Sequence, residues 1–169
     1  TLSHPDCDPI PVDPDRPEDA VTLVTWAAAL TDPGRAAPAF VVRAAERGMT
    51  DSDFPSVALL NHASRRALSQ KAGRDLAMER FRGNVWLDGL APWEEFDLVG
   101  REITLGGARF AVRERITRCR ATCTDPETGR IDINTLDLLE SGWDHTDFGV
   151  YAEVIASGPV AVGDAAGLA

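Results

Sequence analysis

The chain has 169 residues, 44% of them apolar, and a formal net charge of −10, so it can fold around a real core as one domain, or one domain with an extension. The acidic balance argues against nucleic acid as a partner, because nucleic-acid-binding proteins present a broad basic surface. No apolar run approaches the roughly 18 residues of a membrane span, and no secretory signal or transit peptide is recognisable.

Residues 1–47 are predicted to be a lead-in with one helix. Prolines and aspartates dominate residues 1–16, which is typical of an extended or looping segment, and a strand is expected near 10–12. Pro17 suits the first turn of a helix, and apolar residues recur at helical spacing as far as Leu30. A short β-like run follows at 39–42.

From residue 48 to the end, strands outnumber helices, and this region is expected to be the main domain. A helix is predicted over 56–72, ended by Gly73. Gly106 and Gly107 lie between two apolar segments, a pattern typical of a β-hairpin. The remaining predicted elements are a strand at 84–88, a short helix at 134–141, and strands at 148–155 and 160–162. The fold class is therefore mainly β, of the α+β type, with helices outside the sheet.

Residues 109–120 are unusually basic for so acidic a chain. The run holds one cysteine, Cys119, one glutamate and five arginines: Arg109, Arg113, Arg115, Arg118 and Arg120. Guanidinium groups bind phosphate and carboxylate groups well, and neighbouring cations favour a reactive thiolate. The pattern predicts a pocket for an anionic ligand with Cys119 inside it.

An alternative interpretation of the same run is a buried structural cysteine beside solvated charges. If the strand continued through it, Cys119 and Cys123 would lie roughly 13 Å apart, too far for a disulfide or a shared metal. Cys119 would then bind a metal without a second protein sulfur. Cys7 is interpreted as incidental, and three cysteines match neither a disulfide framework nor a zinc site, so a reducing cytoplasm is the expected location.

Four more residues are candidates for contacting a ligand. Arg82 and Asn84 fall on one side of an extended segment, so a guanidinium and an amide would face one ligand. The alternative is an arginine paired with a carboxylate and an asparagine that begins the strand. Thr50 and Ser52 precede the predicted helix, where hydroxyls either cap the helix or help to bind an anion.

Arg118-Cys119, followed by Asp125-Pro126-Glu127-Thr128-Gly129, resembles the signature of the MOSC domain, a family named for the C-terminal part of molybdenum cofactor sulfurases. The family includes the mitochondrial amidoxime-reducing component and its bacterial relatives. Three more matches come in the expected order: Phe81-Arg82-Gly83-Asn84, Phe148-Gly149-Val150-Tyr151 and Val162-Gly163-Asp164. The resemblance covers roughly residues 48–164.

The resemblance implies a compact, closed β-barrel with peripheral helices that binds a molybdopterin-type molybdenum cofactor. Cys119 would be both metal ligand and catalytic residue, and the expected cofactor contacts are Arg82, Asn84, Arg118, Tyr151, Thr50 and Ser52. The implied reaction is a two-electron reduction of an N-hydroxylated or N-oxide small molecule at the molybdenum. The chain shows no haem, flavin or iron–sulfur motif, so the electrons would come from a separate electron-transfer protein.

Other expectations remain open beside this one. The family usually carries a further β-rich segment upstream that supplies basic contacts to the cofactor. Residues 1–47 are therefore interpreted as the tail of a truncated N-terminal segment. If those upstream contacts are missing, the chain is expected to hold no cofactor. Two other functions fit: a non-redox sulfur carrier with a persulfide on Cys119 for maturation of a metal–sulfur cofactor, and a binding module without the metal. A cysteine hydrolase is disfavoured, because neither His62 nor His145 carries a recognisable local signature.

Overall fold

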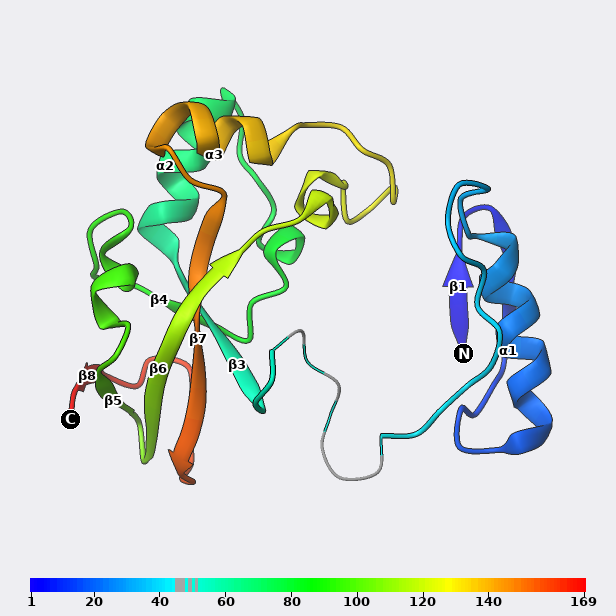
Figure 1. Cartoon of the computed structure of the whole chain (residues 1–169), viewed down its shortest axis with the longest axis horizontal. Helices are drawn as coiled ribbons and strands as arrows, with labels where there is room; N and C mark the ends of the chain where they lie inside the picture. The colour runs from blue at the N-terminus through cyan, green and yellow to red at the C-terminus, as the bar shows by residue number, and fades with distance from the viewer. Residues whose placement is uncertain (45–47, 49, 51) are drawn as a thin grey trace. The chain divides into compact units, whose positions relative to one another are not determined.

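The computed structural model describes residues 1–44, 48, 50 and 52–169, in two compact units, Thr1–Met49 and Thr50–Ala169. In the first unit, β1 (Leu2–His4) and β2 (Cys7–Ile10) form an antiparallel hairpin beside α1 (Pro17–Ala29) (Figure 1). The indole Nε1 of Trp26 in α1 donates to the carbonyl of Asp8, which fastens the helix to the hairpin at 2.9 Å. The helix lies where it was predicted, whereas the described residues 39–42 form no strand.

The second unit is built around one six-stranded sheet with the order β4-β3-β7-β6-β5-β8. All neighbours in this sheet are antiparallel except β3 and β4, which run parallel. Its strands are β3 (Ser56–Asn61), β4 (Val85–Leu87), β5 (Glu102–Leu105), β6 (Ala108–Thr117), β7 (Asp147–Ala156) and β8 (Ala166–Leu168). The expected hairpin at Gly106 and Gly107 is present as β5 and β6.

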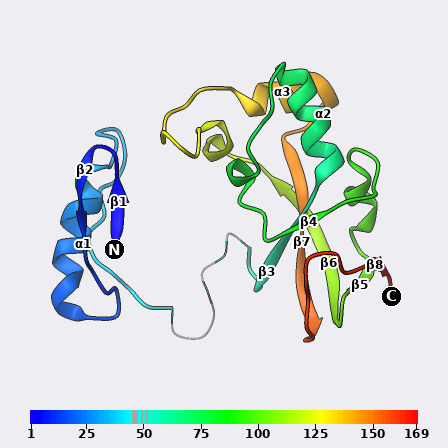
Figure 2. The same cartoon turned by 180° about the vertical axis from the view of Figure 1, so that it is seen from behind.

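The sheet separates two apolar clusters, one on each face. Along β3, Leu59 belongs to one cluster while Ala58 and Leu60 belong to the other, as the alternation of strand side chains requires. Two helices, α2 (His62–Ala72) and α3 (Thr135–Trp143), pack side by side over the second cluster (Figures 1 and 2). Three short 3-10 helices complete the unit: η1 (Met78–Phe81), η2 (Glu94–Leu98) and η3 (Arg120–Cys123).

The α+β class is confirmed, but the sheet is an open half-barrel and not the closed barrel that was expected. Among the described residues, the outer strands β4 and β8 each pair on one side alone, so the two ends of the sheet do not join. Both are three residues long. The barrel stays open because, among the described residues, no further strand joins the outer edge of β4 to the outer edge of β8.

Two predicted elements are wrong. Residues 56–61 form the strand β3, because their apolar run is buried on both faces between β4 and β7, and a run of this kind suits a central strand. The helix begins only at His62, where Asn61 caps it by accepting from the Ala63 N–H at 2.8 Å. The last strand is Ala166–Leu168 and not 160–162.

No helix among the described residues is both long enough and apolar enough to cross a membrane.

Candidate functional site

Cys119 lies just after β6, at the point where the chain turns into η3. Its carbonyl accepts from the backbone N–H of Thr122 at 3.2 Å and from the Thr122 hydroxyl at 3.1 Å, which fixes the turn. Its thiol is exposed, whereas Cys123 is 2% exposed and has its sulfur 3.4 Å from the Thr135 hydroxyl. The expectation that one strand would carry both thiols is wrong, because β6 ends at Thr117. The alternative interpretation, in which Cys119 is a buried structural cysteine, is wrong, because Cys119 is exposed and it is Cys123 that is buried.

Arg118 connects three separate parts of the chain. Its Nε and Nη2 donate to the carbonyl of Phe148 at 2.8 and 2.6 Å, and its Nη1 donates to the carbonyl of Phe81 at 2.8 Å. No carboxylate among the described residues pairs with it. Burial lowers the pKa of Arg118 to about 10, opposed by electrostatic attraction to Tyr151 and Cys119. A half-buried cation is thus held by backbone dipoles beside the exposed thiol.

Two glycines let the backbone beside these carbonyls pack closely against Leu60. Gly149 has φ +82°, a left-handed conformation that sets the peptide plane carrying the Phe148 carbonyl, and a Cβ there would lie 2.0 Å from Leu60 Cδ2. A Cβ on Gly83 would lie 2.3 Å from the other methyl of Leu60. Phe81 and Phe148, which precede these turns, stack with ring centroids 4.1 Å apart. The two phenylalanine motifs and the arginine–cysteine motif therefore meet at one place.

Asn84 and Arg82 have different roles, and they do not share one strand, since β4 begins at Val85. The Asn84 Oδ1 accepts from the Ala58 N–H at 2.9 Å and its own N–H donates to the Ala58 carbonyl at 3.0 Å, so Asn84 fastens β4 to β3. Its side-chain NH₂ makes no hydrogen bond within the described part of the chain and can donate to a ligand. Arg82 has φ +50°, and its exposed guanidinium has no hydrogen bond or ion pair among the described residues. Tyr151, half-buried, lies opposite Ala58 on β7.

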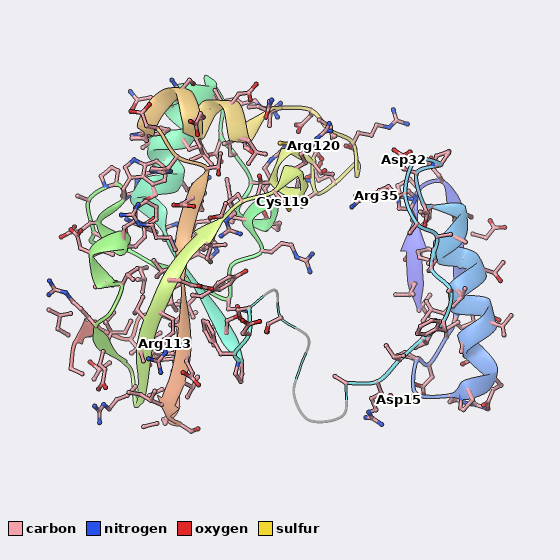
Figure 3. The ribbon with its side chains drawn as sticks, viewed as in Figure 1. Asp15, Asp32, Arg35, Arg113, Cys119 and Arg120 are labelled. Atoms are coloured by element: carbon pink, nitrogen blue, oxygen red, sulfur yellow. The ribbon has the colours of Figure 1, made fainter. Side chains whose placement is uncertain are left out.

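Three arginines of the basic run are neutralised away from Cys119. Arg109 pairs with Glu102, and Arg113 holds Glu153 through Nε at 3.0 Å and Nη2 at 2.7 Å. Arg115 lies 4.0 Å from Asp147 and 4.3 Å from the centre of the Phe96 ring. Figure 3 shows Arg113 at the opposite end of β6 from Cys119, with Arg120 beside the cysteine. Of the five arginines, Arg118 and Arg120 are the two that flank Cys119 in the chain, and Arg120 has no hydrogen bond or ion pair among the described residues.

Thr50 and Ser52 use their hydroxyls within their own loop. The Thr50 hydroxyl is 3.0 Å from the carbonyls of Ser52 and Phe54, and the Ser52 hydroxyl donates to the Phe54 carbonyl at 2.7 Å. They precede a strand and not a helix, so the argument from a helix N-terminus does not apply to them. Their contact with a cofactor stays a prediction.

The segment after η3 is structural. The Asp125 carboxylate accepts from the N–H groups of Glu127 at 2.8 Å and Thr128 at 3.0 Å, which closes a turn that ends at Gly129 and confirms the turn indicated by its proline and glycine. Nearby, the buried Arg80 binds Asp132 at 2.8 and 2.7 Å, and these bonds, with those from Arg74, lower the pKa of Asp132 to about 2. Neither residue had a sequence signal, because the two positions are 52 residues apart.

Two half-buried histidines, His62 and His145, pack against aromatic rings, and one glutamate, Glu95, is fully buried. His62 contacts Trp86 with ring centroids 5.2 Å apart, and His145 contacts Trp93 and Phe96 at 5.3 Å each. Glu95 is 0% exposed and accepts from the side chains of Asn61 and Ser64, at 2.8 Å for the closest bond of each. Burial raises the pKa of Glu95, and these hydrogen bonds oppose the shift. Sequence analysis missed Glu95, since a glutamate beside another in a polar loop resembles a surface residue.

Within the described part of the chain, no group of three or more His, Cys, Asp and Glu side chains is placed to hold a metal ion. The candidate site is therefore an exposed thiol, the Arg118 cation bound to two carbonyls, and the exposed guanidiniums of Arg82 and Arg120.

Comparison with known proteins supports the family resemblance that these motifs suggested. The family model of the MOSC domain matches residues 46–166, which is most of the chain. The chain belongs to the MOSC domain family.

Among its relatives are insect proteins named molybdenum cofactor sulfurase. The MOSC chain is 29% identical over 121 residues to the protein of Anopheles gambiae, covering 64% of this chain and 16% of that protein. It is 31% identical over 96 residues to the protein of Drosophila melanogaster, covering 55% of this chain and 12% of the relative. The chain thus spans a small part of the length of these relatives.

A solved structure shows the same fold. YiiM from Geobacillus stearothermophilus superposes with a TM-score of 0.52 at 18% sequence identity, covering 67% of this chain and 53% of that one. At this identity the likeness concerns the arrangement of the strands and helices alone.

Proposed function

We propose that this MOSC protein binds a molybdopterin-type molybdenum cofactor, with the Cys119 thiolate as the metal ligand, and reduces N-hydroxylated or N-oxide small molecules. One observation carries the proposal: an exposed thiol lies beside a half-buried cation that has no carboxylate partner among the described residues and that connects the three motifs. The names of the sulfurase relatives support a connection with this cofactor.

The residues present fit such a group. A soft metal prefers sulfur, and no second protein ligand is grouped with Cys119 among the described residues, so an organic cofactor would have to supply the other ligands. Arg118 uses three of its five N–H groups on carbonyls and keeps one on each terminal nitrogen. Together with Arg82 and Arg120, these donors suit a phosphate.

The chain's own residues would bind and orient the cofactor. Arg118 holds positive charge beside Cys119 and favours an anion at the sulfur, and Asn84, fixed by its bond to Ala58, offers its amide N–H groups. When bound, the cofactor supplies the two-electron chemistry, which with two protons converts an N–OH group into N–H and water. Tyr151, partly buried on β7, would line the same cavity as the substrate. A separate electron-transfer protein would deliver the electrons, because the chain has no redox motif of its own.

A second function is favoured by the names of the relatives and by the exposure of the thiol. Cys119 would carry a persulfide for maturation of a metal–sulfur cofactor. In that step the Cys119 thiolate attacks the terminal sulfur of a donor persulfide, a new S–S bond forms on Cys119, and the donor leaves as a thiolate. The nearby guanidinium would stabilise the anionic persulfide.

Metal and sulfur analysis of the full chain separates the two functions. Protein expressed with molybdate should contain stoichiometric molybdenum that is lost in Cys119→Ser and kept in the matched control Cys7→Ser. Cyanide-releasable sulfur on Cys119 without molybdenum would support the carrier instead. Absence of both would contradict both functions and leave a binding module that keeps the fold alone.

A further inference from the structure

The two ends of the open sheet meet at one hollow. Its volume is about 410 Å³, and its walls include residues of both outer strands, Leu87 from β4 and 166–168 from β8. These strands stand at opposite ends of the order β4-β3-β7-β6-β5-β8. The hollow is therefore the gap that keeps the half-barrel from closing.

Backbone groups of β8 point into this gap. The Ala169 N–H donates to the Glu102 carbonyl at 3.0 Å and the Gly106 N–H to the Ala165 carbonyl at 3.4 Å, on either side of the register pair Thr104 and Gly167. In an antiparallel ladder every second residue faces the partner. Leu168 and Ala166, which lie between these bonds, therefore direct their N–H and C=O groups away from β5.

β4 contributes to the wall of the hollow in a different way. Ala58 on β3 directs both its C=O and its N–H to Asn84, so the next residue of β3 that faces β4 is Leu60, which the register sets between Val85 and Leu87. Leu87 therefore directs its backbone groups toward β3, and it lines the hollow. The outward backbone donors and acceptors at this opening are those of β8, and such an edge is the feature that lets an extended chain add to a sheet.

The side chains around the hollow define what could enter it. Its floor is apolar, formed by Leu87, Leu90, Leu98 and Ile103, all of which belong to or pack against one core cluster. Its rim carries three carboxylates, Asp88, Glu94 and Asp97, against one guanidinium, Arg101. Asp88 pairs weakly with Arg66 at 3.4 Å. The rim is therefore net acidic above an apolar floor.

We propose that this gap is a docking site for an extended segment of a partner protein in which apolar residues alternate with lysine or arginine. Such a strand places its apolar side chains on the floor and its cations beside the rim carboxylates, since the side chains of a strand alternate. Its backbone pairs with β8 and bridges the half-barrel toward β4. This site is independent of Cys119, so it stands or falls apart from the proposed cofactor function.

The test uses the full chain and a capped, fluorescent peptide in which valine and lysine alternate. We expect saturable binding by fluorescence anisotropy, with the matched valine–glutamate peptide not binding. The substitution Leu168→Pro removes the outward N–H without touching a bond to β5, and it should weaken binding about fivefold, as expected for one lost hydrogen bond. The comparison variant Leu168→Val keeps the N–H and should bind more tightly than Leu168→Pro.

A second pair of variants tests the charge. Glu94→Lys with Asp97→Lys should weaken binding about tenfold, whereas Glu140→Lys, on α3 away from the hollow, should leave it unchanged. Amide hydrogen exchange at Ala166 and Leu168 should slow on peptide addition. No binding of the lysine peptide, equal binding of both peptides, or full binding by Leu168→Pro with native melting would overturn the proposal. So would a chain that dimerises through β8, because the occupant would then be a second copy.

Discussion

Replacing Arg118 by methionine tests whether the arginine holds the site together. The change keeps an unbranched side chain, shorter than arginine, and removes three hydrogen bonds, of 2.8, 2.6 and 2.8 Å, to the carbonyls of Phe148 and Phe81. Bonds from a charged donor contribute about 1.5 to 3 kcal/mol each, but the burial that lowers the pKa of Arg118 to about 10 offsets a large part. We therefore expect the free energy of unfolding to fall by about 2 to 4 kcal/mol.

Urea unfolding followed by tryptophan fluorescence measures this loss. Arg118→Lys keeps the charge, but an ammonium group lacks the planar fork that reaches both carbonyls. Its free energy of unfolding should therefore lie between those of the unchanged chain and Arg118→Met. The matched control is Arg113→Met on β6, the strand that precedes Arg118. The Arg113 guanidinium binds Glu153 at the surface and should contribute less than about 1 kcal/mol. Equal small losses for Arg118→Met and Arg113→Met would refute the reasoning.

A second measurement separates positioning from mere stability. Alkylation of Cys119 by iodoacetamide in the folded chain should be slower in Arg118→Met, because the attacking sulfur loses the cation beside it. Arg118→Lys should restore most of the rate while remaining less stable. An unchanged rate in Arg118→Met would mean that the guanidinium acts on the fold alone.

Three further predictions concern the fold around the site, each checked by urea unfolding. Gly149→Ala should lower the free energy of unfolding by more than about 3 kcal/mol or prevent folding, because the new Cβ would clash with Leu60 at a φ of +82°. Gly73→Ala, at a φ of +69° but with no atom near the new Cβ, should lower it by about 1 kcal/mol. Similar losses for the two variants would contradict this. Asp132→Asn should lower the free energy of unfolding by about 3 kcal/mol at neutral pH, because the buried Arg80 loses its carboxylate partner. The difference from the unchanged chain should shrink as pH falls from about 4 toward 2, where the Asp132 carboxylate becomes protonated through its lowered pKa. Burial raises the pKa of Glu95, so the folded form binds its proton more tightly than the unfolded form does. The unchanged chain should therefore gain stability relative to Glu95→Gln as pH falls through the raised pKa toward the ordinary range of a glutamate, and a loss there would refute the burial argument.

The sequence predicted the elements whose signal is local. The helix at Pro17 and the Gly106-Gly107 hairpin depend on turn and capping residues that act within a few positions, and both are present. The helix expected over 56–72 was half wrong because a short apolar run fits a strand or a buried helix equally well by periodicity. Only the position of β3 between β4 and β7 decides it. The closure of the barrel could not be predicted either, since it depends on which strands meet at the edges.

The candidate site was predictable as residue types and not as contacts. The basic run around Cys119 suggested a pocket of arginines, but Arg109, Arg113 and Arg115 pair with carboxylates from other strands. Those partners lie up to 40 residues away in the sequence, so spacing within the run could not reveal them. Thr50 and Ser52 likewise turned toward the carbonyls of their own loop.

The arginine beside the cysteine explains why short motifs so far apart belong together. Arg118 needs two carbonyl acceptors, and each comes from a phenylalanine followed by a turn that sets its direction, at Arg82 with φ +50° and at Gly149 with φ +82°. Side-chain patterns cannot show this, because the acceptors are backbone atoms that every residue possesses. The same bonds leave the charge of Arg118 without a carboxylate among the described residues, so an anion at Cys119 is the partner that this arrangement favours. The fold and the proposed chemistry thus depend on one guanidinium.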